Sequence, residues 1–170
     1  MIEITDEFLS EEDYEKIMMR FTDINFPWYL GKKSHQFGDL QLCHMLYNCS
    51  SSIHQSPYLE YISPILRELK LVSISRIKVN CQLLRENPVK SDYHNDLVIQ
   101  GNIEPNVTNL LYYLNSNNGY TEFENGEIVE SVGNRLVKFP NTLKHRGVSQ
   151  TNSESRIVLN FNLCFSSSVG

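Results

Sequence analysis

Residues 73–84 read SISRIKVNCQLL, and this segment decides the fold class. It is rich in residues that favour strands, and the apolar residues from Ile77 to Leu83 alternate with polar ones, which predicts a long strand with one buried face. Further strand-like segments follow at a spacing of about ten residues, which is typical of a sandwich or barrel rather than a parallel sheet with crossovers. They are VTNLLYYLN (107–115), TEFE (121–124), EIVESV (127–132), RLVKFP (135–140) and SRIVLNFNLCF (155–165).

The N-terminal part of the chain has a different pattern, and its first 70 residues predict mostly helix. Ser10 resembles a helix cap, and apolar residues then recur at helical spacing as far as Phe21. Residues 57–70 predict a second helix, which Pro64 should kink or restart. The stretch between the two predicts loops with one or two strands. Helices first and strands afterwards predict a mainly β (α+β) fold, in which helices buttress one sheet of a jelly roll.

Length and composition fit one globular domain. The chain has 170 residues, of which 41% are hydrophobic and 21% charged, and this argues against wholesale disorder. The net charge of −5 argues against a protein that depends on nucleic-acid phosphates, and no apolar run is long enough to span a membrane. The acidic N-terminus does not resemble a signal peptide and the four cysteines form no C-x-x-C pair, so we expect a cytoplasmic protein with reduced thiols.

An H-x-D pair is the first candidate for chemistry. Two-residue spacing on an extended chain places the side chains of His94 and Asp96 on the same face. An imidazole and a carboxylate aimed together can supply two ligands to a divalent metal. A second histidine from across the barrel would complete a two-His, one-carboxylate site with open positions, which suits Fe(II) oxygen chemistry. A pair this short also arises by chance, and a hydrogen-bonded pair at a loop edge is the alternative.

Two later residues strengthen the metal hypothesis. His145 follows a predicted strand and a Pro-Asn turn, and its alternative is a polar loop residue. Arg156 begins the otherwise apolar strand RIVLNFNL, where a guanidinium is costly unless it binds an anion. The alternative for Arg156 is an exposed strand end.

In this order the residues resemble the Fe(II)- and 2-oxoglutarate-dependent dioxygenases, and among them the small prolyl-hydroxylase-like proteins of bacteria and phages. The resemblance implies a double-stranded β-helix (jelly roll, cupin-like) and a single oxygenase domain over 1–170. Within it, 1–72 would form the helical buttress and loops, and 73–165 the β-helix core. The residues that carry the resemblance are Tyr93-His94-x-Asp96, LLYYLN (110–115), Gly119-x-Thr121-x-Phe123, Phe139-Pro140, His145 and Arg156.

The resemblance also implies roles for five residues. His94, Asp96 and His145 match the iron ligands of the family. Arg156 matches the basic residue that pairs with the distal carboxylate of 2-oxoglutarate, a bidentate contact that suits arginine. Tyr113 matches a position whose hydroxyl reaches the same carboxylate. The implied cofactors are Fe(II), 2-oxoglutarate as cosubstrate, and O2.

Departures from the family pattern qualify these roles. Asn118 replaces the first glycine of the usual G-G-x-T-x-F segment, and asparagine tolerates positive φ. Val158 stands where related enzymes often carry Ser or Thr, so either Tyr113 is more important here or 2-oxoglutarate binds more weakly. Strand alternation should place Tyr112 on the opposite face from Tyr113. The retained carboxylate ligand argues against a halogenase, and the absence of a second arginine in RIVLNFN argues against a nucleic-acid demethylase.

The implied function is hydroxylation of an unactivated C–H bond with release of succinate and CO2, preferentially on a prolyl residue of a peptide or protein. The alternatives are the same chemistry on a free amino acid or small metabolite, and a non-catalytic metal-binding jelly-roll module. We therefore expect a peptide, protein or small-molecule substrate, no nucleic-acid or membrane partner, and a cytoplasmic location in a bacterium or phage-infected host.

Other residues have no place in this constellation. His35, His44 and His54 match no ligand spacing, and we interpret them as surface or loop histidines. Residues 97–106 lack strand patterning and predict either a lid over the iron or an ordinary hairpin loop.

Overall fold

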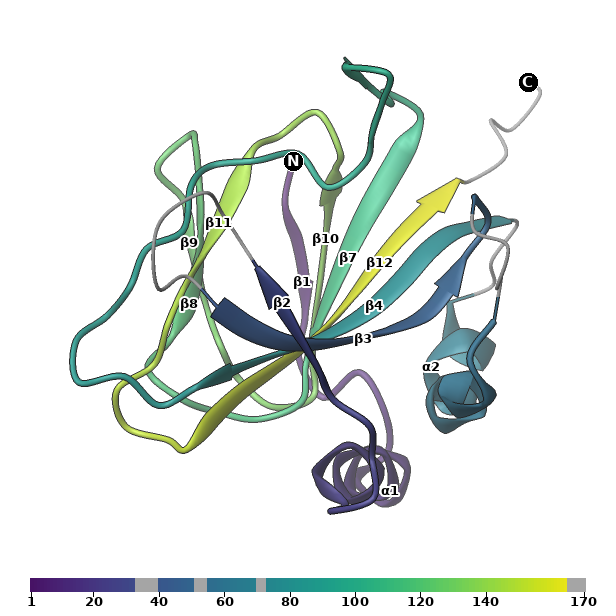
Figure 1. The fold of residues 1–170 in the computed structure, drawn as a ribbon. Coiled ribbons are helices and arrows are strands. Elements are labelled where there is room, and N and C mark those ends of the chain that lie inside the picture. Colours follow the sequence, from purple (N-terminus) through teal and green to yellow (C-terminus); the bar gives the residue numbers. More distant parts are fainter. Residues whose placement is uncertain (33–39, 51–54, 70–72, 165–170) are drawn as a thin grey trace.

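The fold was analysed in a computed structural model, which describes residues 1–32, 40–50, 55–69 and 73–164. Two antiparallel sheets form the body of the molecule (Figure 1). In spatial order, the large sheet consists of β1 (Glu3–Thr5), β10 (Arg135–Pro140), β7 (Val107–Tyr113), β12 (Ser155–Cys164), β4 (Ser73–Leu83), β3 (Leu40–Asn48) and β2 (Tyr29–Lys32). The small sheet consists of β11 (His145–Val148), β8 (Tyr120–Phe123) and β9 (Ile128–Glu130). A separate hairpin is formed by β5 (Val98–Ile99) and β6 (Asn102–Ile103).

The helices cover the face of the large sheet that points away from the small sheet (Figure 1). They are α1 (Glu11–Thr22), the 3-10 helix η1 (Pro57–Ile62) and α2 (Ser63–Glu68). Phe21 of α1 and Ile65 of α2 are buried together with Ile77 of β4 and Phe161 of β12, which places the larger apolar core between helices and sheet. No helix in the described part of the chain combines the length and the apolar character that a membrane crossing requires.

Local sequence signals explain where the helices begin. The Ser10 hydroxyl accepts a hydrogen bond from the backbone N–H of Asp13 at 3.2 Å, so the predicted cap of α1 is confirmed. The predicted second helix is divided in two, because Pro64 stands in the first turn of α2 directly after the 3-10 helix. The predicted restart at this proline is therefore confirmed.

The expectation of mostly helix in the first 70 residues is wrong in part, because this region also supplies β1, which was not predicted. Strands β2 and β3 lie between the helices, where one or two strands were expected, so that prediction is confirmed. Only three exposed residues form β1, which is too short for an alternating pattern. The register of β3 against β4 shifts between Met45 and Tyr47, and such an irregularity interrupts the alternation that identifies a strand. Strand β11 was also not predicted, since HRGV contains a glycine and two basic or imidazole side chains.

Strand alternation gives the large sheet two different faces. The apolar residues Ile77 and Val79 of β4 and Ile157 and Leu159 of β12 belong to the core beneath the helices. The residues between them therefore face the small sheet. These inward residues are mainly polar: Arg76, Lys78, Asn80 and Gln82 on β4, and Arg156, Val158, Asn160 and Asn162 on β12.

Candidate functional site

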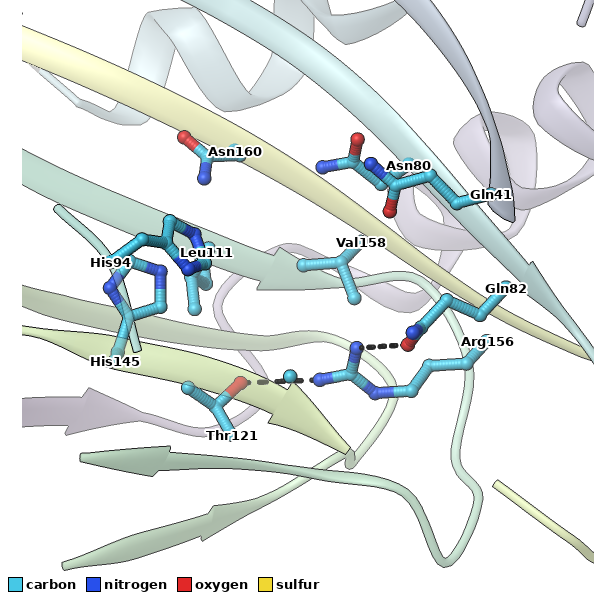
Figure 2. Close-up of a pocket in the computed structure, with 11 residues that line it drawn as sticks. Gln41, Asn80, Gln82, His94, Leu111, Thr121, His145, Arg156, Val158 and Asn160 are labelled. Carbon is cyan, nitrogen blue, oxygen red and sulfur yellow. Dashed lines mark hydrogen bonds between the residues drawn. The ribbon is translucent and has the colours of Figure 1, made fainter. Parts of the chain in front are cut away.

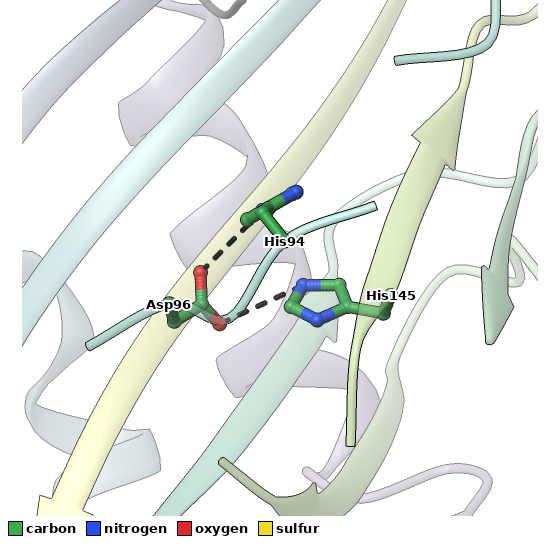
Figure 3. Close-up of side chains that lie close together, drawn as sticks. All are labelled: His94, Asp96 and His145. Carbon is green, nitrogen blue, oxygen red and sulfur yellow. Dashed lines mark ion pairs between the residues drawn. The ribbon is translucent and has the colours of Figure 1, made fainter. Parts of the chain in front are cut away.

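His94, Asp96 and His145 lie together between the two sheets (Figure 3). Asp96 Oδ1 is 3.8 Å from His94 Nε2, and Asp96 Oδ2 is 3.6 Å from His145 Nε2. One ligand atom from each residue falls within 4.8 Å of the others. The side chains of Asp96 and His145 are 4% and 5% exposed, whereas that of His94 is 43% exposed, so the cluster opens on the His94 side. Two imidazoles and one carboxylate at this separation can surround a divalent cation such as Fe(II).

Backbone pairing brings the two histidines together across the fold. His94 and His145 exchange both N–H···O=C hydrogen bonds, at 3.0 and 3.1 Å, which joins the segment before Asp96 to the edge of β11. His94 Nδ1 lies 3.0 Å from the carbonyl oxygen of Asp92. If Nδ1 carries the proton and donates it there, Nε2 keeps its lone pair on the side of Asp96, as a metal ligand requires.

The two oxygens of the Asp96 carboxylate have different surroundings. Oδ1 accepts hydrogen bonds from Asn160 Nδ2 at 3.0 Å and from Arg76 at 3.4 Å. Oδ2 is buried and accepts no hydrogen bond from any described residue. Burial alone would raise the pKa of Asp96, but the nearby charges of His145 and Arg76 outweigh it and hold the pKa below its usual range. A buried anionic oxygen without a donor fits a metal ion, so the residues present fit the cation that the family implies.

A cavity of about 60 Å³ extends from the two histidines to Arg156 (Figure 2). Arg156 is 5% exposed, and its guanidinium donates to Ser131 Oγ at 2.7 Å, Gln82 Oε1 at 3.1 Å and Thr121 Oγ1 at 3.2 Å. All three acceptors are neutral, and no carboxylate among the described residues pairs with the guanidinium. Burial lowers the pKa of Arg156, as expected for a cation without a counter-ion. This end of the cavity therefore suits an anion.

Tyr113 lies beside Arg156 but not on the cavity wall. Its hydroxyl donates to Thr121 Oγ1 at 2.8 Å, and the guanidinium of Arg156 is 5.4 Å from the centre of its ring. Thr121 lines the cavity instead, and so does Val158 (Figure 2). Tyr112 points to the helix side, where its hydroxyl donates to Asn134, so the predicted opposite orientation of the two tyrosines is confirmed.

The amide side chains of the cavity wall were missed by the sequence analysis. Gln41 of β3, Asn80 and Gln82 of β4, and Asn160 of β12 all line the cavity (Figure 2). The amide oxygen of Asn80 is buried without a hydrogen-bond partner among the described residues. The available signal was the row of polar residues that alternates with the apolar residues of 73–84, but a row of this kind usually faces solvent.

The segment after Asp96 is a short hairpin rather than an irregular loop. Residues 97–106 contain β5 and β6, which pair with each other. The Asn141 side chain ties the hairpin to the barrel, because it accepts from the backbone N–H of Leu97 at 3.1 Å and donates to the Leu97 carbonyl at 2.8 Å. The hairpin does not line the cavity, so the structure supports the hairpin alternative over the lid.

His44 is not the surface or loop residue that we expected. It is 6% exposed on β3, with Nδ1 2.7 Å from the carbonyl oxygen of Pro27 and Nε2 2.8 Å from Ser56 Oγ. Partners on both ring nitrogens allow an imidazole to be buried among aromatic residues, which is the physical reason for the difference. His35 and His54 lie outside the described residues.

Comparisons with known proteins identify the fold. No family model and no curated protein sequence matches the chain. The viral collagen prolyl hydroxylase of Paramecium Bursaria Chlorella virus-1, solved as a 2OG complex, is 13% identical, with a TM-score of 0.60 over 96% of each chain. A 2OG-Fe(II) oxygenase family protein from Burkholderia pseudomallei is 9% identical, with a TM-score of 0.68 over 96% of this chain and 84% of that one.

A third solved structure was determined with a peptide. This prolyl hydroxylase from Trichoplax adhaerens, in complex with a hypoxia inducible factor peptide fragment, is 11% identical, with a TM-score of 0.64 over 96% of this chain and 83% of that one. At such identities the likeness concerns the fold. The protein has the double-stranded β-helix fold of the 2OG-Fe(II) oxygenases, with N-terminal helices against the large sheet, as the sequence predicted.

Proposed function

We propose that the protein is an Fe(II)- and 2-oxoglutarate-dependent dioxygenase that hydroxylates an unactivated C–H bond. One observation carries the proposal: a single cavity has the His94–Asp96–His145 cluster at one end and, at the other, the buried guanidinium of Arg156, which forms no ion pair with a described residue. A molecule that chelates a metal through one carboxylate and carries a second carboxylate at its far end is complementary to both ends. 2-Oxoglutarate has this chemistry.

The metal would be held by the Nε2 atoms of His94 and His145 and by Asp96 Oδ2. Asn160 and Arg76 already occupy Asp96 Oδ1, so they would direct the other carboxylate oxygen toward the metal. With Fe(II) and 2-oxoglutarate bound, the cofactors supply the oxidation, in which one atom of O2 enters the C–H bond and the other enters succinate as CO2 is released.

Arg156 would anchor the distal carboxylate of 2-oxoglutarate. Ser131 and Thr121 accept from two different guanidinium nitrogens and so fix the plane of the group before the ligand arrives. An incoming carboxylate offers charged acceptors in place of the neutral Gln82 oxygen, and the resulting hydrogen bonds are stronger. Tyr113 supports this arrangement through Thr121, and direct contact of its hydroxyl with 2-oxoglutarate remains a prediction.

We further infer one oxygenase domain over 1–170, with 1–72 as buttress and loops and 73–165 as the β-helix core. The proposed substrate is a prolyl residue of a peptide or protein, which is supported by the likeness to prolyl hydroxylases and by the peptide bound to one of them. The same chemistry on a free amino acid or small metabolite is the second candidate, because such a substrate can bring a carboxylate to the positive charges of Arg76 and Lys78, as an acidic peptide also can.

An anaerobic titration with Fe(II) and 2-oxoglutarate tests the cofactor assignment. We expect the weak visible charge-transfer band of the metal chelate in the wild-type protein, and its loss in His145→Ala. Lys144→Ala is the matched control, because Lys144 is the exposed neighbour of His145 and its hydrogen bonds with Glu124 are made by its backbone N–H and carbonyl, which the substitution keeps. If no band forms in folded protein, the oxygenase proposal fails and the non-catalytic metal-binding module takes its place.

A further inference from the structure

Two cationic side chains stand side by side on the inner face of β4. The intervening Ile77 and the following Val79 are buried beneath the helices, so Arg76 and Lys78 both face the small sheet. Lys78 is directly opposite Asn160 in the register of β4 and β12. Asn160 of β12 donates a hydrogen bond to Asp96. Lys78, on the neighbouring strand β4, therefore lies level with the proposed metal site.

The two cations differ in how their charge is compensated. Arg76 donates to Asp96 Oδ1 at 3.4 Å and to Asn162 Oδ1 at 2.7 Å. Lys78 forms no hydrogen bond or ion pair with any described residue, although its side chain is partly buried. Burial lowers the pKa of Lys78 and the positive charge of Arg76 acts in the same direction, whereas Cys43 and Asp96 act in the opposite direction without outweighing burial. An ammonium group in this position is complementary to an anion from outside the chain.

The proposed cofactors do not supply that anion. Asp96 and a doubly charged 2-oxoglutarate would offset Fe(II) and Arg156, which leaves the charges of Arg76 and Lys78 without a further anionic partner among the described residues. Asp96 lies close to these strands but belongs to neither. The described residues of β4 and β12 contribute no carboxylate to the inner face. Since charges interact more strongly where they are partly buried than in bulk water, the remaining positive charge favours a ligand with negative charge.

We propose that the substrate carries a carboxylate, which Lys78 binds beside the C–H bond that is hydroxylated. This inference rests on the proposed function and narrows its substrate class. The carboxylate belongs either to a free amino acid or small metabolite, or to an acidic residue of a peptide. Its rival is a lysine that only extends its ammonium into water at the rim of the barrel.

Two pairs of probes that differ only in a carboxylate test the proposal. The first pair is N-acetyl-L-proline and N-acetyl-L-prolinamide. The second is an end-blocked pentapeptide with Glu next to Pro and the same peptide with Gln. Calorimetric titration of the full chain, loaded anaerobically with Fe(II) and 2-oxoglutarate, should show that the carboxylate member of one pair binds about tenfold or more tightly than its amide. Preference in the first pair assigns a free carboxylate, and preference in the second an acidic peptide.

Substitutions then locate the preference. Lys78→Met should reduce the carboxylate-to-amide ratio to about one, and Lys78→Arg, which keeps the charge, should retain most of it. Lys16→Met, which removes an exposed lysine of α1, should leave the ratio unchanged. Equal binding within both wild-type pairs, including no binding at all, overturns the proposal. A preference that survives Lys78→Met in folded protein also overturns it.

The same samples separate this inference from the proposed function. A charge-transfer band without a carboxylate preference removes the inference and leaves the oxygenase proposal in place. A carboxylate preference that depends on Lys78, in protein without the band, removes the oxygenase proposal and leaves the carboxylate-binding role of Lys78 in place.

Discussion

The two faces of the large sheet are built from the same strands but differ in polarity and in their contribution to stability. On the helix side, β12 presents Ile157, Leu159 and Phe161, all buried. On the cavity side the same strand presents Arg156 and Asn160, also buried but polar. Each fully buried apolar side chain contributes roughly 1.5–3 kcal/mol, whereas a buried, hydrogen-bonded polar group contributes little net stability. The comparison indicates that β12 maintains the fold mainly through its helix face, while the polar part of its cavity face can bind ligands. The apolar part of that face, Val158, packs in the smaller core between the two sheets.

The largest expected effect is on metal binding, in the cavity face. His145→Ala should abolish the charge-transfer band and succinate formation, because it removes one of the three side chains that would hold the metal. His94→Ala and Asp96→Ala should do the same. Succinate release from 2-oxoglutarate is the measurement, and full activity in any of the three variants would refute the ligand set.

The next largest effect is on stability, in the helix face. Phe161→Ala should lower the free energy of unfolding by about 3–5 kcal/mol, because it opens a cavity in the core beneath the helices. Urea denaturation of metal-free protein measures the change. A loss of less than about 1 kcal/mol would show that the helix face does not dominate stability, and the contrast between the two faces would fail.

Arg156→Met is expected to separate binding from stability. It should weaken 2-oxoglutarate binding by about 100-fold, since a charged partner of the distal carboxylate is lost. The free energy of unfolding of metal-free protein should stay the same or rise, because a buried cation that has no counter-ion among the described residues is replaced by an apolar side chain of similar length. Unchanged dependence on 2-oxoglutarate would show that another residue binds the carboxylate.

Asn160→Leu sharpens the comparison further. The side chain does not belong to the ligand set, but it holds Asp96 Oδ1 at 3.0 Å. Its loss should weaken metal affinity by about 10- to 100-fold, as measured by competition with a chelator of known affinity. Asn118→Leu, in an exposed turn of the small-sheet side, provides a comparison of the same chemical change away from the metal. Equal metal affinity in the two variants would contradict the positioning role of Asn160.

Most of the strands could be predicted, because alternation of apolar and polar residues is a local property. Segments 73–84 and 155–165 correspond to β4 and β12 within one residue at each end. Strand β11 could not be predicted, since HRGV has no strand pattern and is extended only because it pairs with β8 and with His94. Its position depends on contacts between residues that are distant in the sequence.

The candidate site was predictable to a different extent. The H-x-D spacing and the costly position of Arg156 are visible in the sequence, and the resemblance joined them to His145. The amides of Asn80, Gln82 and Asn160 were not predictable as cavity residues. In a single strand, a polar residue opposite an apolar face has the same pattern whether it meets water or a second sheet. Only the position of the small sheet distinguishes the two.

The backbone bridge between His94 and His145 has a consequence for the order in which the barrel opens. The bridge joins two segments between which the chain forms the strands β5 to β10. A metal bound by residues on both sides of it would act as a removable cross-link, which lowers the chain entropy that opening releases. Metal binding should therefore slow amide hydrogen exchange most strongly at the backbone bridge between His94 and His145. After chelation of the metal, this bridge should be the first part of the barrel to open.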